Sequence, residues 1–167
     1  MTTKEQNLNP NILQIELQNN NVSHVVWLPD TETSFLYDLI DQDPEIDIIP
    51  ICREAESMPI AAGLWIGGKK PIIMIQNTGM FESGDSIRGM CVDLKIPMVI
   101  LVGYRGWNES KKFTDSAAKY TEPIIQAWGI KYFTIKNNSE ISLISKAFKE
   151  AYENNSPVIC LIATEYE

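Results

Sequence analysis

Short runs of apolar, largely β-branched residues alternate along the chain with segments of helical periodicity. Six such runs predict strands: Val22–Leu28, Ile46–Ile51, Ile72–Gln76, Met98–Gly103, Lys131–Ile135 and Val158–Ala163. The stretches PIIMI, PMVILV and PVICLIA hold no charged positions, which is typical of strands covered on both faces. We therefore expect a parallel sheet with helices on both sides.

Segments with helical spacing of apolar residues lie before and between these runs. They cover residues 10–19, 35–40, 54–65, 87–94, 124–128 and 141–152. Asn9 followed by Pro10 predicts the start of the first helix, because a capping side chain before a proline is typical of helix N-termini. Ser139 is expected to cap the last helix. Pro59 favours a start of the third helix later than Glu54, since proline is tolerated best in the first turn.

The strict alternation of helix and strand predicts the fold class. The order α(βα)₅β implies right-handed crossovers and an α/β fold with a doubly wound, six-stranded parallel sheet. A length of 167 residues is typical of one domain, so we expect a single domain over residues 1–167. Ligands of such sheets bind at the carboxyl ends of the strands. Four loops are therefore of interest: Pro29–Ser34, Cys52–Glu56, Asn77–Asp85 and Tyr104–Ser116.

The charge balance is acidic, with 14 Lys and Arg against 22 Asp and Glu. This balance argues against a nucleic-acid partner, because sequence-independent binding needs clustered cations that displace counterions from phosphates. No apolar run approaches the roughly 20 residues that span a bilayer, and Met1–Pro10 lacks the apolar core of a signal peptide. We expect a cytoplasmic protein with neither a nucleic-acid nor a membrane partner.

Histidine and cysteine offer little for a metal centre or a nucleophilic site. Cys52, Cys91 and Cys160 are odd in number and lie beside apolar residues, which indicates buried, reduced thiols. His24 is the single histidine and begins an apolar run, so we interpret it as a partly buried strand residue. The chain is thus expected to carry no metal ligands of its own.

Acidic residues directly follow the second predicted strand. The segment Arg53-Glu54-Ala55-Glu56 should bring at least one carboxylate to the ligand-binding edge of the sheet. Acidic residues also favour helix N-termini, where the helix dipole and free N–H groups attract them. The residues alone leave both explanations open.

The next two strand ends carry amides and a cation. Gln76-Asn77-Thr78-Gly79-Met80 predicts a turn that could cradle a phosphate, although the chain contains neither GxGxxG nor GxxxxGK[ST]. Classical dinucleotide and P-loop sites are therefore disfavoured. Arg105 could hold a carboxylate, sulfonate or phosphonate with its planar fork, or it could form an ordinary surface ion pair.

Several of these pieces occur together at a particular spacing. Glu54 lies nine residues before Gly63 of an Ala-Ala-Gly helix, and three further motifs follow: Gly68-Lys69-Lys70-Pro71, Gln76-Asn77-Thr78-Gly79 and Tyr104-Arg105-Gly106. This combination resembles the pyrimidine-binding domain of thiamine diphosphate-dependent 2-oxo acid decarboxylases, most closely the sulfopyruvate and phosphonopyruvate decarboxylase family. The resemblance extends more weakly over nearly the whole chain.

The resemblance implies roles for individual residues. Glu54 would be the catalytic glutamate that hydrogen-bonds the aminopyrimidine ring of thiamine diphosphate and activates the cofactor. Glu54, Gln76, Asn77, Thr78 and Gly79 would bind the cofactor. The substrate, an anionic 2-oxo acid, would be bound by Pro29, Asp30, Asn77 and Arg105. Met80-Phe81-Glu82-Ser83 departs from the Leu-Gly-Asn run of the family.

The resemblance also implies that the active site needs a second domain, which this chain does not provide. Complete enzymes of this class bind diphosphate through Mg²⁺ on a second domain with a Gly-Asp-Gly motif, and Gly84-Asp85-Ser86 is a poor match to it. The chain would therefore be an α subunit, completed by a β subunit that binds most of the Mg²⁺, with self-association of α chains. Separate subunits favour sulfopyruvate decarboxylase over phosphonopyruvate decarboxylase.

Two further hypotheses belong to other classes of protein. A non-catalytic regulatory module would keep the thiamine diphosphate-binding fold without needing Glu54. A flavodoxin-like mononucleotide binder would need only the sheet, but the loops offer no phosphate motif.

Overall fold

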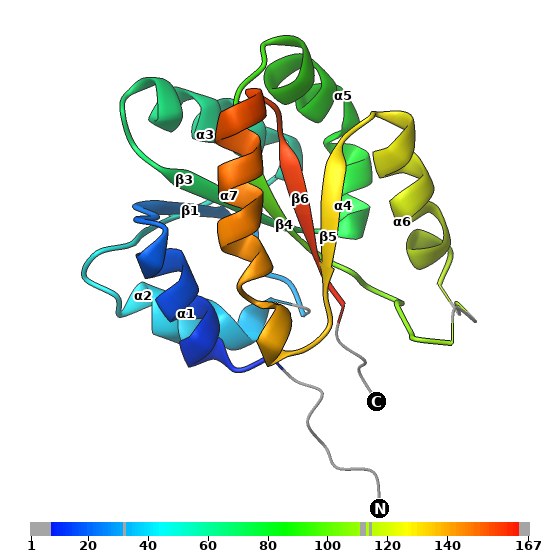
Figure 1. Ribbon diagram of the computed structural model, residues 1–167, viewed down its shortest axis with the longest axis horizontal. Coiled ribbons are helices and arrows are strands. Elements are labelled where there is room, and N and C mark those ends of the chain that lie inside the picture. The colour runs from blue at the N-terminus through cyan, green and yellow to red at the C-terminus, as the bar shows by residue number, and fades with distance from the viewer. Residues whose placement is uncertain (1–7, 32, 111–112, 114, 164–167) are drawn as a thin grey trace, which may run out of the picture.

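The computed structural model describes residues 8–31, 33–110, 113 and 115–163. Within these residues six strands form one sheet: β1 (His24–Trp27), β2 (Asp47–Pro50), β3 (Pro71–Gln76), β4 (Val99–Gly103), β5 (Lys131–Ile135) and β6 (Val158–Ile162). The strand order is β2-β1-β3-β4-β6-β5, and every neighbouring pair is parallel (Figure 1). The predicted fold class, a doubly wound parallel α/β sheet, is confirmed.

Helices and short helical turns connect the strands in the described part of the chain. The α-helices are α1 (Pro10–Asn19), α2 (Tyr37–Asp41), α3 (Ser57–Ile66), α4 (Asn77–Glu82), α5 (Gly84–Ser86), α6 (Ser116–Ala127) and α7 (Leu143–Asn154). The 3₁₀ turns are η1 (Ser34–Leu36), η2 (Glu54–Glu56) and η4 (Asn138–Glu140), and η3 (Ile87–Asp93) is a π-helix.

Two helix starts follow the sequence signals. The side chain of Asn9 accepts a hydrogen bond from the Asn11 amide at 3.0 Å, so the predicted cap of α1 is confirmed. Helix α3 begins at Ser57, which places Pro59 in the first turn, where its missing N–H costs no intrahelical bond. The late start of α3 leaves Glu54 in a separate 3₁₀ turn.

Two local predictions were wrong. The segment after β3 was expected to form a turn, but α4 begins directly at Asn77. Packing decides this, because Met80 is buried in the core although Gly79 lowers helix propensity. Ser139 does not cap α7. The side chain of Asn137 instead accepts from the Ser139 amide and caps the 3₁₀ turn η4, after which α7 follows at Leu143.

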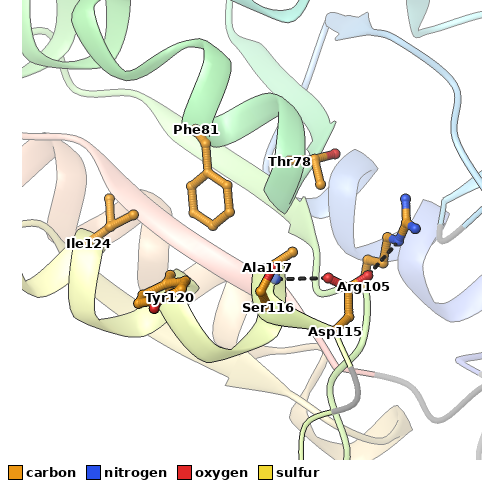
Figure 2. Close-up of a pocket in the computed structure, with 8 residues that line it drawn as sticks. All are labelled: Thr78, Phe81, Arg105, Asp115, Ser116, Ala117, Tyr120 and Ile124. Atoms are coloured by element: carbon orange, nitrogen blue, oxygen red, sulfur yellow. Dashed lines mark hydrogen bonds and ion pairs between the residues drawn. The ribbon is translucent and has the colours of Figure 1, made fainter.

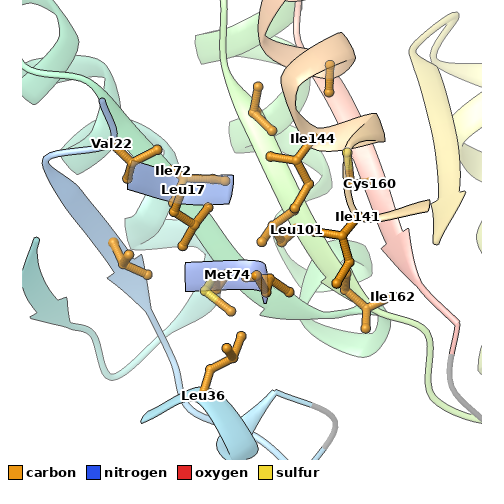
Figure 3. Packing of buried hydrophobic residues seen from close by; sticks show 14 of the residues in the cluster. Leu17, Val22, Leu36, Ile72, Met74, Leu101, Ile141, Ile144, Cys160 and Ile162 are labelled. Carbon is orange, nitrogen blue, oxygen red and sulfur yellow. The ribbon is translucent and has the colours of Figure 1, made fainter. Parts of the chain in front are cut away.

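The sheet separates two apolar layers. Helices α1, α2 and α7 cover one face, and α3, α4, η3 and α6 cover the other. Alternate strand residues enter opposite layers: Ile72 and Met74 the first, and Ile73 and Ile75 the second. Figure 3 shows part of the first layer, where Leu17 of α1 lies near Ile72 and Met74. Burial on both faces explains why the central strands lack polar positions.

The remaining predictions about single residues have mixed outcomes. His24 is a half-buried residue of β1, as expected, and its Nδ1 lies 2.9 Å from the Ser23 hydroxyl. The three cysteines are free. Cys91 and Cys160 are buried, and burial raises the pKa of the Cys91 thiol to about 12, but Cys52 is exposed in the turn before η2, contrary to prediction. In the described ranges no helix is long and apolar enough to cross a bilayer.

The strand order selects one edge of the sheet for ligand binding. After β1 the chain forms β2 on one side, and β3 then pairs with the other side of β1. Such a reversal opens a crevice at the carboxyl ends of the two diverging strands. Pro29 and Asp30 follow β1, and Asn77 follows β3. Glu54 and Arg105 follow the flanking strands β2 and β4. The segments after all four strands therefore meet at this edge of the sheet.

Candidate functional site

Glu54 and Gly79, two residues predicted from separate motifs, are in direct contact. Glu54 begins η2, and Gly79 lies in α4. A Cβ atom added at Gly79 would lie 2.3 Å from Cγ of Glu54 and 2.7 Å from its Cδ and Oε1. No side chain fits at position 79 while Glu54 keeps this position. Glycine is therefore required at this point for space and not for backbone freedom.

The Glu54 carboxylate is half-buried and has no partner among the described side chains. Its backbone carbonyl accepts a hydrogen bond from the Ser57 hydroxyl, whereas its carboxylate makes no hydrogen bond or ion pair within the described residues. The carboxylate also does not cap η2. The N-cap residue of η2 is Arg53, and its side chain makes no cap hydrogen bond there. This arrangement weakens the explanation that Glu54 serves only a helix N-terminus.

A second carboxylate occupies the capping position. Glu82, the last residue of α4, accepts from Arg53 Nε through Oε1 at 2.5 Å and from the Ala55 amide through Oε2 at 3.0 Å. Both partners are chain neighbours of Glu54. Sequence reasoning missed this contact, because Glu82 is 29 residues from Arg53 and carries no local signal.

Asn77 joins the ends of two strands beneath the site. Its side chain is fully buried, and its amide group donates to the Arg105 carbonyl and to the Thr121 hydroxyl, each at 3.0 Å. The Thr121 hydroxyl in turn donates to the Ala117 carbonyl. Within the part of the chain that the structure describes, the Asn77 Oδ1 has no hydrogen-bond partner. Asn77 thus ties the end of β3 to the end of β4 and to α6.

The other predicted residues of this edge lie closer to solvent. Exposed Thr78 donates its hydroxyl to Gln76 Oε1 at 2.5 Å, and Gln76 is half-buried. After β1, Pro29 is exposed, and Asp30 Oδ1 accepts from the Thr33 amide at 3.1 Å. These residues lie at the ends of β1 and β3, where the strand order switches.

Arg105 is paired with an acidic residue of the next helix. Its Nε lies 3.0 Å from Asp115 Oδ2, and 53% of its side chain is exposed. Asp115 Oδ1 also accepts from the Ala117 amide and caps α6. Gly106 has a φ of +79°, and a Cβ there would lie 2.6 Å from the Asp115 Cβ, so glycine permits this close approach. The ion pair that the sequence left as an alternative is present.

Tyr104 anchors the strand end that carries Arg105. Its hydroxyl donates toward Glu122 of α6 at 3.1 Å, and Tyr132 of β5 donates to the other Glu122 oxygen at 2.8 Å. Burial, reinforced by the Glu122 carboxylate, raises the pKa of Tyr104 well above its usual value. Tyr104 therefore remains a protonated donor at all ordinary pH values, which holds β4 and α6 together.

A pocket of about 360 Å³ lies between α4 and α6 (Figure 2). Its lining residues are Thr78, Phe81, Arg105, Asp115, Ser116, Ala117, Tyr120 and Ile124. Arg105 and Asp115 form a charged end, and Phe81, Tyr120 and Ile124 form an apolar end. Of the predicted site residues, Thr78 and Arg105 reach this pocket. Asp115 could have been found from its place before the α6 pattern, as capping residues are common there.

Helix α4 separates the site into two sides. Gly79 and Glu82 contact the Glu54 turn, whereas Thr78 and Phe81 face the pocket toward α6. Residues three apart lie on the same side of a helix, which accounts for both pairs. Among the described residues, no three His, Cys, Asp or Glu side chains are grouped to hold a metal ion.

Comparisons with known proteins point to one group of enzymes. No protein-family model matches the chain. It is 26% identical over 147 residues to sulfopyruvate decarboxylase subunit alpha of Methanococcus maripaludis, covering 87% of this chain and 88% of that subunit. The subunit alpha of Methanocaldococcus jannaschii is 28% identical over 152 residues, with 90% of each chain covered. The resemblance inferred from the motifs is confirmed by these similarities.

Two longer proteins match with part of their length. Sulfopyruvate decarboxylase of Methanosarcina acetivorans is 27% identical over 159 residues, which are 93% of this chain and 40% of that protein. A solved structure of 2-oxoglutarate:ferredoxin oxidoreductase from Magnetococcus marinus superposes with a TM-score of 0.70 at 12% identity. The match covers 92% of this chain and 28% of that one, and it shows a shared fold.

Proposed function

We propose that this chain is the pyrimidine-binding α subunit of a thiamine diphosphate-dependent 2-oxo acid decarboxylase, most specifically of sulfopyruvate decarboxylase. The reaction would convert sulfopyruvate to sulfoacetaldehyde and CO₂. The observation that carries the proposal is the contact between Glu54 and Gly79, where a carboxylate without a partner among the described residues lies against a bare Cα at the ligand-binding edge of the sheet. The similarity to the named α subunits supports it.

The residues at this edge fit an aminopyrimidine ring. Such a ring offers nitrogen atoms for a carboxylate to hydrogen-bond, and no described residue uses the hydrogen-bonding capacity of the Glu54 carboxylate. Glu54, Gln76, Asn77, Thr78 and Gly79 would hold the ring, with Glu54 keeping a proton at the ring nitrogen. When bound, thiamine diphosphate supplies the thiazolium that accepts the electron pair released with CO₂. The work of this chain is to bind and orient that ring.

The substrate would lie on the side of the pocket toward Arg105. A guanidinium can bind a sulfonate with two parallel hydrogen bonds, and more than half of the Arg105 side chain is exposed. Pro29 and Asp30 complete the proposed substrate side, and the buried Asn77 would support it from beneath through its hydrogen bond to the Arg105 carbonyl. The Asp115 carboxylate competes with the anionic tail of the substrate for the same guanidinium.

A partner chain would supply the rest of the active site. The names of the similar α subunits imply a further subunit in those proteins. We propose a β subunit that carries the diphosphate and Mg²⁺ site, together with association of α chains. One domain over residues 1–167 would then form half of each active site.

The test is co-expression of the chain with a candidate β subunit, followed by assays of aldehyde release from sulfopyruvate, phosphonopyruvate and pyruvate. We expect neither chain alone to release aldehyde and the mixture to act best on sulfopyruvate. Preference for phosphonopyruvate would change the substrate assignment but retain the enzyme class. A purified complex that binds Mg²⁺ and thiamine diphosphate without releasing any aldehyde would support the non-catalytic module instead. Binding of a flavin mononucleotide by the isolated chain would support a mononucleotide binder.

A further inference from the structure

Glu82 hydrogen-bonds the residues on both sides of Glu54. One carboxylate oxygen binds Arg53 Nε at 2.5 Å, and the other binds the Ala55 amide at 3.0 Å. Arg53 and Ala55 are the residues immediately before and after Glu54. The Ala55 amide belongs to the peptide group that follows Glu54, and the orientation of that group directs the Glu54 Cβ. The Glu82 carboxylate therefore constrains where the Glu54 side chain points.

We propose that Glu82 is a positioning residue that holds Glu54 in place for its cofactor, an inference that rests on the proposed function. Helix α4 constrains this turn at two points, with Gly79 against the Glu54 side chain and Glu82 on the amide of the next residue, Ala55. Gly79 and Glu82 are three residues apart and therefore lie on one face of the helix. Two constraints from one rigid element define a side-chain position better than either one alone.

This role accounts for the acidic residue in the unusual segment Met80-Phe81-Glu82-Ser83. The segment departs from the Leu-Gly-Asn run that is typical of the resembled family. In the structure, Met80 is buried in the core, and Phe81 lines the pocket toward α6. Glu82 accepts a hydrogen bond from the turn that contains Glu54. The acidic member of the segment thus serves the activating glutamate.

A purely stabilising role predicts that loss of Glu82 lowers the melting temperature and leaves kcat unchanged. The Arg53 side chain is 70% exposed, and such surface ion pairs contribute little to the free energy of unfolding. Positioning acts on the catalytic geometry, where a displacement of about 1 Å can cost on the order of a hundredfold in rate. Loss of Glu82 should therefore lower kcat while the melting temperature stays near that of the parent.

The test compares Glu82→Ala and Glu82→Gln with Asp93→Asn. Asp93 forms an exposed ion pair with Arg88 at 2.6 Å in which neither residue bonds the Glu54 turn, and so provides the control. In the full isolated chain, NMR measures hydrogen exchange of the Ala55 amide. In the complex with the β subunit, the readouts are exchange of the cofactor C2 proton, kcat and KM.

We expect the Ala55 amide to exchange about tenfold faster in Glu82→Ala, because its acceptor is gone. Glu82→Gln should give an intermediate rate, since its carbonyl oxygen still accepts one hydrogen bond. In the complex, Glu82→Ala should slow C2 exchange and kcat by about tenfold or more, with KM and cofactor affinity unchanged. Asp93→Asn should match the parent in every measurement.

Two results would overturn the proposal separately from the proposed function. If Glu82→Ala leaves Ala55 exchange unchanged in the isolated chain, Glu82 does not anchor the turn. If Ala55 exchange rises but C2 exchange and kcat equal those of the parent, the anchor does not position Glu54. Failure of the parent complex itself to exchange the C2 proton would instead contradict the proposed function.

Discussion

The two sides of helix α4 hold charged residues in opposite ways. On one side, the Glu54 carboxylate has no side-chain partner among the described residues, its side chain lies against Gly79, and Glu82 bonds its chain neighbours Arg53 and Ala55. On the other side, the Arg105 guanidinium is neutralised by Asp115 and remains more than half exposed. One charged group is held in place with its hydrogen-bonding capacity free, and the other is engaged and accessible.

This difference indicates different tasks for the two sides. A group that must activate a bound ring benefits from a fixed position and a free carboxylate, because catalytic power depends on pre-arranged geometry. A group that binds and releases an anionic substrate can exchange one carboxylate partner for another at little cost, because exposed ion pairs are weak. Four predictions test this contrast.

The largest effect is expected from Glu54→Gln in the complex with the β subunit. The amide cannot stabilise a protonated ring nitrogen as a carboxylate does, so kcat should fall at least about a hundredfold. The exposed Glu56 lies in the same turn, and Glu56→Gln is therefore the matched control, with near-parental activity expected. If Glu56→Gln is inactive and Glu54→Gln is active, the catalytic assignment belongs to the other residue.

Gly79→Ala should disturb Glu54 without changing its chemistry. The new Cβ would lie 2.3 Å from Glu54 Cγ, so the glutamate side chain has to move. We expect kcat to fall about tenfold or more, as for other small misplacements of catalytic groups. Gly89→Ala is the control, since a Cβ at Gly89 meets no atom within 4 Å. A parental kcat for Gly79→Ala would show that the position of Glu54 is not critical.

Arg105→Lys tests the side of α4 that faces Arg105 and Asp115. Lysine keeps the positive charge but loses the planar fork, so the preference for sulfopyruvate over pyruvate should fall about tenfold. Cofactor affinity, measured by calorimetry on the complex, should not change. Unchanged substrate preference with lower stability would assign Arg105 to its ion pair with Asp115 alone.

Asp115→Asn should have the smallest effect, and in the opposite direction. Asparagine caps a helix about as well as aspartate, so α6 keeps its N-terminus and the free energy of unfolding should change by less than about 1 kcal/mol. Arg105 loses its competing carboxylate, and KM for sulfopyruvate should fall about two- to threefold. Asp115→Ala provides the contrast, because it also removes the cap and should cost about 1 kcal/mol. A KM for Asp115→Asn that rises would show that the ion pair supports substrate binding.

Local patterns in the sequence determined most of the secondary structure. Strands buried on both faces leave uninterrupted apolar runs, and all six were found within a few residues of their ends. The cap at Asn9 and the late start of α3 follow from side-chain chemistry over a few neighbouring residues. The spacing of Glu54 to the Ala-Ala-Gly helix, one of the motifs that together carried the resemblance, is also local, since it involves one turn and the helix that follows it.

Long-range packing decided what the sequence did not show. Helix α4 begins with Asn77 and contains Gly79, both poor helix formers, yet burial of Met80 and contact with Glu54 stabilise it. Asp115 pairs with Arg105 only because the chain returns to the end of β4 before α6 begins. Glu82 meets Arg53 across 29 residues, through two elements that the sheet brings together. Such contacts depend on the order of strands in space, which the alternation of helix and strand along the chain leaves open.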